Sequence, residues 1–118
     1  MNKSSRNTLN GDCHILDCTL RDGSYVNNFQ FTSKDTEFIF SNLQNIGIKY
    51  IEIGHGRGLG AYRTASSSIT SDEEHLIAAN KVKLNAHCGM FCIPGLATLE
   101  DIDLAYAYKM DFIRIVKF

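Results

Sequence analysis

The 118-residue sequence lacks several features that would assign it to a specialised class of protein. No apolar stretch approaches the roughly 18 residues of a membrane-spanning helix, and the polar start MNKSSRNTLNGD contains no apolar segment of a secretory signal. The 12 basic and 13 acidic side chains form no run of either sign that would indicate binding to nucleic acid or to a membrane. These absences predict a cytoplasmic protein whose partner is a small molecule or another protein.

The sequence also lacks the cysteine spacing of common structural zinc sites. The spacings are C-x4-C for Cys13 and Cys18 and C-x3-C for Cys88 and Cys92, whereas zinc ribbons use C-x2-C pairs. All four cysteines lie in or beside apolar runs, which is typical of buried, reduced thiols. Zinc binding is the alternative, and disulfides are not expected in the cytoplasm.

Four short apolar runs predict four strands. They cover residues 13–20, 50–56, 88–94 and 111–118, and each is short enough to be a strand rather than a helix. The segments between them have helical periodicity. Each begins with a hydroxyl side chain followed three residues later by a carboxylate, which is typical of a helix N-terminus: the hydroxyls belong to Thr32, Ser71 and Thr98.

The first predicted helix has a recognisable apolar stripe and a recognisable end. Ile39, Leu43 and Ile46 recur at helical spacing, and Gly47 stands where a left-handed residue after a helix is favoured. We therefore expect these three apolar side chains to face the core.

The resulting order, β-α-β-α-β-α-β, predicts an α/β fold with parallel strands and right-handed crossovers. It fits the N-terminal half of a TIM (βα)8 barrel or a small, open, doubly wound sheet. Both folds place their chemistry at the C-terminal ends of the strands, where the polar and glycine-rich loops RDGSYVNN and GHGRGLGAYRTASSS are expected. Residues 1–12 are expected to be a flexible tail, and residues 13–118 form the partial-barrel domain.

Arg21 and Asp22 stand side by side at the end of the first apolar run. A carboxylate there can supply an oxygen ligand to a hard divalent metal, and a guanidinium can hold a carboxylate or a developing enolate with two donors. The alternative is that Asp22 and Gly23 only form a turn, with Arg21 as a surface cation. The residues alone leave both readings open.

Three segments together resemble a known superfamily of enzymes. LDCTLRDG, IEIGHGRGLG and IPGLATLEDIDLAYAYKMDFIRIVKF are similar to the N-terminal half of metal-dependent (βα)8 lyases with a T-L-R-D-G first strand, and the similarity covers residues 13–118. This superfamily includes 4-hydroxy-2-oxovalerate aldolase, hydroxymethylglutaryl-CoA lyase, isopropylmalate synthase and pyruvate carboxyltransferases, and the pattern E-x-x-H-G-x-G-L points to the aldolase branch. The resemblance implies carbon–carbon bond cleavage or formation on a 2-oxo acid through a pyruvate enolate, assisted by Mn²⁺ or Mg²⁺.

The resemblance also implies roles for particular residues. Asp22 matches the metal ligand, and Arg21 matches the arginine that polarises the keto oxygen and stabilises the enolate. His55 matches a histidine at the end of the second strand, for which we expect a structural role or a supporting role behind the site.

Tyr25 departs from the family pattern, because the aldolases carry there a histidine that handles the proton of the 4-hydroxyl group. A phenol with a reference pKa of about 10 is a poor base near neutrality. Tyr25 is therefore a candidate proton donor or substrate hydrogen-bond partner, unless the acid/base group lies elsewhere or the activity differs. The alternative for Tyr25 is a ring that packs over the barrel mouth.

A second departure concerns the metal site and the partners. Family members complete the site with an H-x-H pair on the seventh strand, and this sequence contains no such pair. One carboxylate should bind Mn²⁺ or Mg²⁺ weakly.

A half barrel leaves open sheet edges, so we expect self-association or pairing with a missing C-terminal half. The aldolase branch further implies an aldehyde dehydrogenase partner. The alternative function is an interaction or regulatory module that is catalytically incomplete.

The rival motif is G-x-G-x-x-A at Gly56, Gly58 and Ala61, which has the form of a dinucleotide-binding turn. Such a turn should be followed at once by a helix, whereas YRTASSSIT is expected to continue as a loop. A further alternative is that the same glycines and residues 66–68 hold an anionic group with backbone N–H donors.

Overall fold

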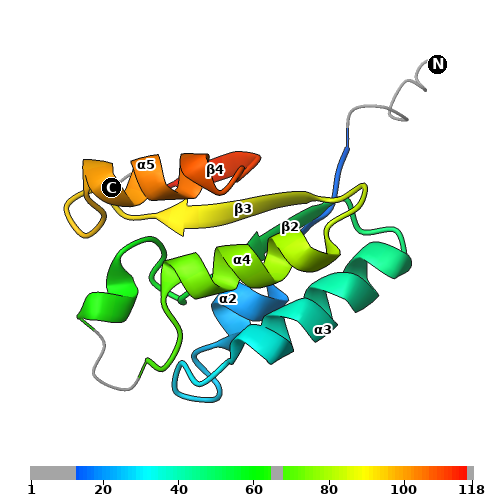
Figure 1. The fold of residues 1–118 in the computed structure, drawn as a ribbon, viewed down its shortest axis with the longest axis horizontal. Coiled ribbons are helices and arrows are strands. Elements are labelled where there is room, and N and C mark those ends of the chain that lie inside the picture. Colours follow the sequence, from blue (N-terminus) through cyan, green and yellow to red (C-terminus); the bar gives the residue numbers. More distant parts are fainter. Residues whose placement is uncertain (1–12, 65–67, 117–118) are drawn as a thin grey trace.

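The computed structural model describes residues 13–64 and 68–116. Their elements follow one another as β1 (Leu16–Asp17), α2 (Thr19–Gly23), α3 (Ser33–Asn45), β2 (Tyr50–Ile53), η2 (Ala61–Arg63), α4 (Asp72–Val82), β3 (His87–Cys92), α5 (Leu99–Ala107) and β4 (Phe112–Ile115). Figure 1 shows the strands side by side, with the helices packed along them. The tail expected at residues 1–12 lies outside the described residues. No helix in the described part of the chain is both long and apolar enough to cross a membrane.

The four strands form one parallel sheet in the order β1-β2-β3-β4. Each strand therefore lies beside the next one in the chain, and helices α3, α4 and α5 make the connections. A doubly wound sheet would reverse its strand order at a switch point. The simple order confirms the predicted architecture, which is the N-terminal half of a (βα)8 barrel.

The three predicted helix starts are confirmed as capping boxes. In each one the hydroxyl accepts a hydrogen bond from the backbone N–H three residues later, and the carboxylate of that later residue accepts one from the backbone N–H of the cap: the caps are Thr32, Ser71 and Thr98. Two of the backbone donors that a helix leaves unpaired at its start are satisfied in this way.

Replacing Ser71 by alanine is expected to lower the free energy of unfolding by about 1 kcal/mol, because the backbone N–H of Glu74 loses its side-chain acceptor. Urea denaturation followed by circular dichroism measures this loss. The control is Ser41→Ala within α3, where no cap is removed. Equal stability of the two variants would show that the capping box contributes nothing.

The apolar stripe of α3 differs from the prediction at one end. Ile39 and Leu43 pack against the core as expected, and Phe40 is fully buried. Ile46, however, is 75% exposed, because α3 ends at Asn45 and the C-cap residue turns away from the core. Gly47 has the expected positive φ of 98°.

The predicted first strand is mostly not a strand. Of residues 13–20, only Leu16 and Asp17 pair with β2, and the chain then turns into the short helix α2. Asp17 causes this turn, because its carboxylate accepts hydrogen bonds from the backbone N–H (2.8 Å) and the hydroxyl (3.0 Å) of Thr19. Arg21 and Asp22 consequently lie in a helical turn just after β1 rather than in the strand.

The two faces of the sheet have different surroundings. Helices α3, α4 and α5 cover one face (Figure 1), whose buried strand residues are Ile51, Ile53, Cys88, Met90 and Cys92. Because side chains alternate along a strand, the register places another set on the opposite face: Tyr50, Glu52, Phe91, Phe112 and Arg114. We call this second set the inner face, since it corresponds to the inside of a barrel.

The cysteines follow the expected burial only in part. Cys88 and Cys92 are buried, Cys18 is partly buried and Cys13 is exposed, and all four are free thiols. Burial raises the pKa of the Cys88 thiol to about 12, so this thiol stays protonated.

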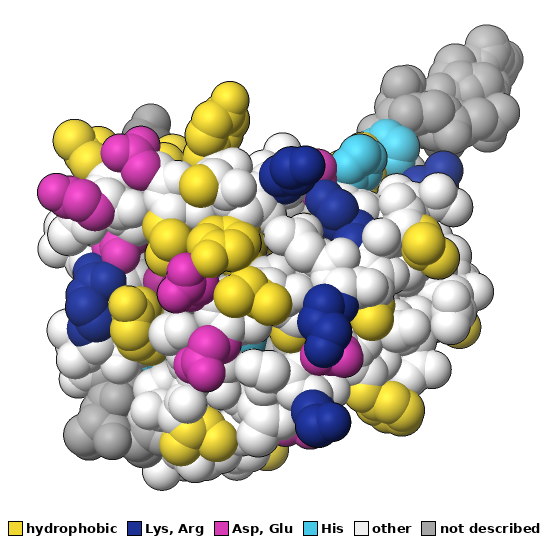
Figure 2. Space-filling model, viewed as in Figure 1, with side chains coloured by type: hydrophobic (Ala, Val, Ile, Leu, Met, Phe, Trp, Pro, Cys, Tyr) yellow, Lys and Arg dark blue, Asp and Glu magenta, His cyan; other side chains and the backbone are white. Residues whose placement is uncertain are grey.

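The helix-covered side of the molecule carries basic and acidic side chains interspersed with hydrophobic ones (Figure 2), and it shows no large area of charge of one sign.

Candidate active site at the C-terminal ends of the strands

Arg21 is held rigidly at the C-terminal end of the inner face. Its Nε donates to Glu52 Oε1 (2.8 Å), and its Nη1 donates to the carbonyl oxygen of Gly56 (3.0 Å). The guanidinium carbon lies 4.5 Å from the centre of the Phe91 ring. Within the described residues, Nη2 donates to no oxygen acceptor, and the Arg21 side chain also interacts with the Cys18 thiol. A guanidinium held in this way, with one donor group not bonded to an oxygen, is preorganised to bind an oxyanion.

Glu52 is a site residue that the sequence reasoning missed. Its carboxylate is fully buried and accepts hydrogen bonds from two arginines, Arg21 and Arg114. Burial would raise the pKa of Glu52, but the bonds from Arg114 and Arg21 outweigh burial and hold the pKa below its ordinary value, so Glu52 is ionised. The signal was present in the sequence: a lone acid between Ile51 and Ile53 in a covered strand requires a partner.

Asp22 is open to solvent, with a side chain that is 71% exposed and one oxygen 3.8 Å from Nη1 of Arg21. This carboxylate is free to serve as a metal ligand. Among the described residues, however, no group of three or more histidine, cysteine, aspartate or glutamate side chains is placed to hold a metal ion. Mn²⁺ and Mg²⁺ need several ligands, so the described residues offer one ligand and do not form a metal site by themselves.

Tyr25 and His55 are brought together by Phe29. The Phe29 ring stacks on His55 with ring centres 4.0 Å apart, and it meets Tyr25 edge-on at 5.2 Å. The Tyr25 ring also lies on Gly56, where any Cβ would clash with it. Since Arg21 binds the Gly56 carbonyl, Tyr25 and Arg21 contact the same residue, and Tyr25 is half exposed beside it.

His55 is buried within this stack. Its Nδ1 accepts a hydrogen bond from the backbone N–H of Arg57 (3.0 Å), so the neutral ring carries its hydrogen on Nε2. Burial and the nearby Arg57 charge both lower the pKa of His55, which keeps the ring neutral near pH 7. These contacts support the structural role that we expect for His55.

The glycines after β2 serve packing rather than nucleotide binding. Gly58 has a φ of 89°, and a Cβ at this position would clash with the carbonyl group of Phe91, which accepts a hydrogen bond from the neighbouring Leu59 N–H (2.8 Å). The glycines are followed by the three-residue turn η2, and α4 begins only at Asp72. The dinucleotide alternative therefore lacks the helix that it needs. Of the serines in the other anion-binding alternative, residues 66 and 67 lie outside the described residues.

Two buried carboxylates lie behind this loop. Asp101 accepts two hydrogen bonds from the Arg63 guanidinium, at 2.6 and 2.7 Å, and this pairing lowers the pKa of Asp101 to about 2. Asp72 accepts a hydrogen bond from the Gly60 N–H through Oδ2 (2.8 Å), while Oδ1 is buried without a partner. Burial raises the pKa of Asp72 to about 6.

Asp72 gives a pH dependence of stability with a defined sign. The folded protein keeps the Asp72 proton up to about pH 6, whereas the unfolded chain loses it near the ordinary value of 3.8. The Asp72 contribution to the free energy of unfolding should therefore fall by about 2–3 kcal/mol as pH rises from 4 to 6. Burial lowers the pKa of His75 to about 4, which contributes a rise over the same range, so the Asp72 contribution is measured as the difference between two pH profiles. Asp72→Asn should lack the Asp72 contribution, whereas Asp103→Asn, at an exposed position of α5, should keep it. An unchanged profile in Asp72→Asn would contradict the assignment.

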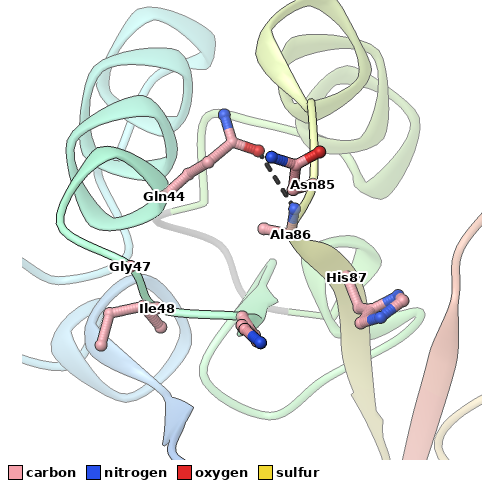
Figure 3. Close-up of a pocket in the computed structure, with 7 residues that line it drawn as sticks. Gln44, Gly47, Ile48, Asn85, Ala86 and His87 are labelled. Carbon is pink, nitrogen blue, oxygen red and sulfur yellow. Dashed lines mark hydrogen bonds between the residues drawn. The ribbon is translucent and has the colours of Figure 1, made fainter.

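A separate pocket lies at the opposite ends of β2 and β3. Its volume is about 440 Å³, and its lining residues include Gln44, Lys49 and His87. Figure 3 shows Gln44 bonded to the backbone at Ala86, and the Gln44 side-chain oxygen also accepts a hydrogen bond from Leu84 N–H (2.7 Å). The pocket thus lies at the N-terminal ends of the strands. In a (βα)8 barrel, residues at this end usually serve stability, and the active site lies at the other end.

Comparison with known proteins identifies the family of this chain. A family model described as HMGL-like matches residues 12–117. An oxaloacetate decarboxylase from Mycobacterium tuberculosis is 46% identical over 86% of this chain and 30% of its own length. 4-Hydroxy-2-oxovalerate aldolases from Serratia proteamaculans (36% identical, 31% of its length) and Moorella thermoacetica (38%, 30%) match the same share of this chain. The chain spans about 30% of the length of these relatives. It belongs to the HMGL-like family.

Proposed function

We propose that this chain contributes to a carbon–carbon lyase that acts on a 2-oxo acid through an enolate. The observation that carries the proposal is the Arg21 guanidinium, which is fixed by Glu52 and Gly56 and lies beside the open carboxylate of Asp22. The membership of the HMGL-like family supports it. The 2-oxo acid, the metal and the reaction of the whole protein all belong to the proposal.

In the proposed mechanism, Arg21 binds the keto oxygen of the substrate and stabilises the negative charge that develops there when the carbon–carbon bond breaks. Glu52 keeps Arg21 oriented, and because two arginines share this one carboxylate, the three groups together keep a net positive charge. The half-exposed hydroxyl of Tyr25 is available to donate a hydrogen bond or a proton to the substrate. A bound Mn²⁺ or Mg²⁺, with Asp22 as one ligand, would supply Lewis-acid polarisation of the keto and carboxylate oxygens.

Two reactions lead to the same enolate. Retro-aldol cleavage of a 4-hydroxy-2-oxo acid, which the sequence resemblance favours, needs a base for the proton of the 4-hydroxyl group. Decarboxylation of a 2-oxo dicarboxylate needs no such base, because carbon dioxide leaves directly. At position 25 this chain has a phenol where the aldolases carry the histidine that handles this proton, and this difference favours decarboxylation as the second candidate. The relative that carries the name oxaloacetate decarboxylase is consistent with it.

The test is pyruvate release by the whole protein that contains this chain, in the presence of Mn²⁺, from 4-hydroxy-2-oxovalerate and from oxaloacetate separately. The released pyruvate is measured through its reduction by lactate dehydrogenase. The rate of spontaneous decarboxylation of oxaloacetate is subtracted. We expect release from one of the two substrates, abolished by a chelator. Release from neither would contradict the proposal and favour the interaction module.

The expected partners and location also remain proposals. Self-association or a missing C-terminal half would cover the inner face, and analytical ultracentrifugation distinguishes a monomer from a dimer. An aldehyde dehydrogenase partner is expected only if the retro-aldol reaction occurs, since only that reaction releases an aldehyde. A cytoplasmic location is consistent with both reactions.

A further inference from the structure

Glu52 is shared unequally between its two arginines. Arg114 of β4 takes the bidentate position, with Nε bonded to Oε2 and Nη2 bonded to Oε1, both at 2.8 Å. Arg21 donates to Glu52 only through Nε, also at 2.8 Å to Oε1. Arg21 donates through Nη1 to the Gly56 carbonyl, and its Nη2 donates to no oxygen within the described residues.

Arg114 is itself fixed in this position. It lies opposite Phe91 in the register of β3 and β4, and its guanidinium carbon is 4.8 Å from the centre of the Phe91 ring. Its Nη2 also contacts the Cys18 sulfur at 3.8 Å. Burial and the Glu52 charge raise the pKa of Cys18, so a neutral thiol faces Arg114 and does not compete with Glu52 for its charge.

The unequal sharing determines what Arg21 can offer a substrate. A carboxylate and a guanidinium with no other partners prefer two parallel hydrogen bonds. Without Arg114, Oε2 of Glu52 would be open, and Arg21 could turn to bind both carboxylate oxygens. In such a pair Nη2 of Arg21 would donate to Glu52, as Nη2 of Arg114 does, and would no longer be available to a substrate.

We propose that Arg114 is a positioning residue, which occupies Glu52 in a bidentate pair and thereby keeps the Nη2 group of Arg21 available for the substrate oxyanion. This inference rests on the proposed function of Arg21 as the substrate-binding group. It assigns Arg114 no contact with the substrate.

The structural consequence is tested by a crystal structure of Arg114→Gln. We expect Arg21 to make two hydrogen bonds to Glu52, through Nε and Nη2. Arg21 in its present position, with Nε alone on Glu52, would overturn the proposal. This measurement needs no ligand and is independent of the proposed function.

The functional consequence is tested with pyruvate as the probe, by isothermal titration calorimetry with Mn²⁺ present. We expect Arg114→Gln and Arg114→Lys each to weaken binding about tenfold, because neither side chain provides the fork of donors. Arg63→Gln is the matched control, since Arg63 is also bidentate on a buried carboxylate and its side chain is 43% exposed against 42% for Arg114. It should leave pyruvate affinity unchanged.

The outcomes separate the two proposals. Arg21→Gln with wild-type affinity for pyruvate, or no pyruvate binding by the wild type, would contradict the proposed function. Loss of binding in Arg21→Gln with wild-type affinity in Arg114→Gln would contradict the positioning role alone. Wild-type affinity in Arg114→Lys would show that charge suffices and would overturn the argument from the bidentate geometry.

Discussion

Replacing Glu52 by alanine is expected to lower the free energy of unfolding by about 3–5 kcal/mol. The carboxylate is fully buried and is the shared acceptor of Arg21 and Arg114. Its removal leaves two guanidinium groups close together without a counter-charge and opens a cavity between the strands. Urea denaturation at pH 7, where Glu52 is ionised, measures the loss.

Two further variants make this prediction specific. Glu52→Gln keeps the volume and one acceptor oxygen, so we expect a smaller loss than in Glu52→Ala. Asp103→Ala removes an exposed carboxylate and should change stability by no more than about 0.5 kcal/mol. If Glu52→Ala were as stable as Asp103→Ala, the Arg21–Glu52–Arg114 network would not stabilise the fold.

Replacing Arg21 by glutamine is expected to lower kcat/KM for pyruvate release by about 10²–10³-fold. Glutamine cannot supply the positive charge that stabilises the enolate oxygen. The fold should survive, because Glu52 keeps its bidentate partner Arg114. Steady-state kinetics with the substrate that the wild type cleaves measures the effect, and circular dichroism checks the fold.

Arg63→Gln is the control for this variant, because Arg63 pairs with Asp101 away from the inner face. We expect it to retain the wild-type kcat/KM. A value for Arg21→Gln within threefold of the Arg63→Gln value would exclude Arg21 from the stabilisation of the transition state.

Local signals in the sequence were sufficient for the three long helices, α3, α4 and α5, but not for the first strand or for the short helix α2. A capping box involves residues three apart, so Thr32, Ser71 and Thr98 could be identified from the sequence alone. The end of β1 depended on Asp17, whose side chain turns the backbone at Thr19 and begins α2. An apolar run gives no indication of such a bond, and the predicted strand was therefore too long.

The candidate site likewise contains residues that could be identified from the sequence and residues that could not. Arg21 and Asp22 were identified because they form a contiguous motif. Glu52 and Arg114 were missed as a pair because they are 62 residues apart and meet only when β2 and β4 flank β3. Each is a lone charge inside an apolar strand, in YIEI and FIRI, and two such charges of opposite sign predict a buried ion pair once the parallel order is known.

The aromatic stack of Tyr25, Phe29 and His55 could be identified only from the three-dimensional structure. Phe29 reaches His55 and Tyr25 because Asn28 and Phe29 both adopt left-handed backbone conformations, with φ of 59° and 62°. Asparagine tolerates this conformation, whereas phenylalanine rarely adopts it. No sequence pattern indicates such a pair, so the contact between two predicted site residues through Phe29 was not expected.

The most direct test of the proposed enolate chemistry is exchange of the pyruvate methyl hydrogens with solvent deuterium, followed by proton NMR with Mg²⁺ present. Enolate formation is common to both candidate reactions and requires no second substrate. We predict that the wild-type protein removes the methyl signal and that Arg21→Gln or a chelator prevents the loss. A methyl signal that persists with the wild type, or that disappears equally fast with Arg21→Gln, would contradict the role of Arg21 as the group that stabilises the enolate.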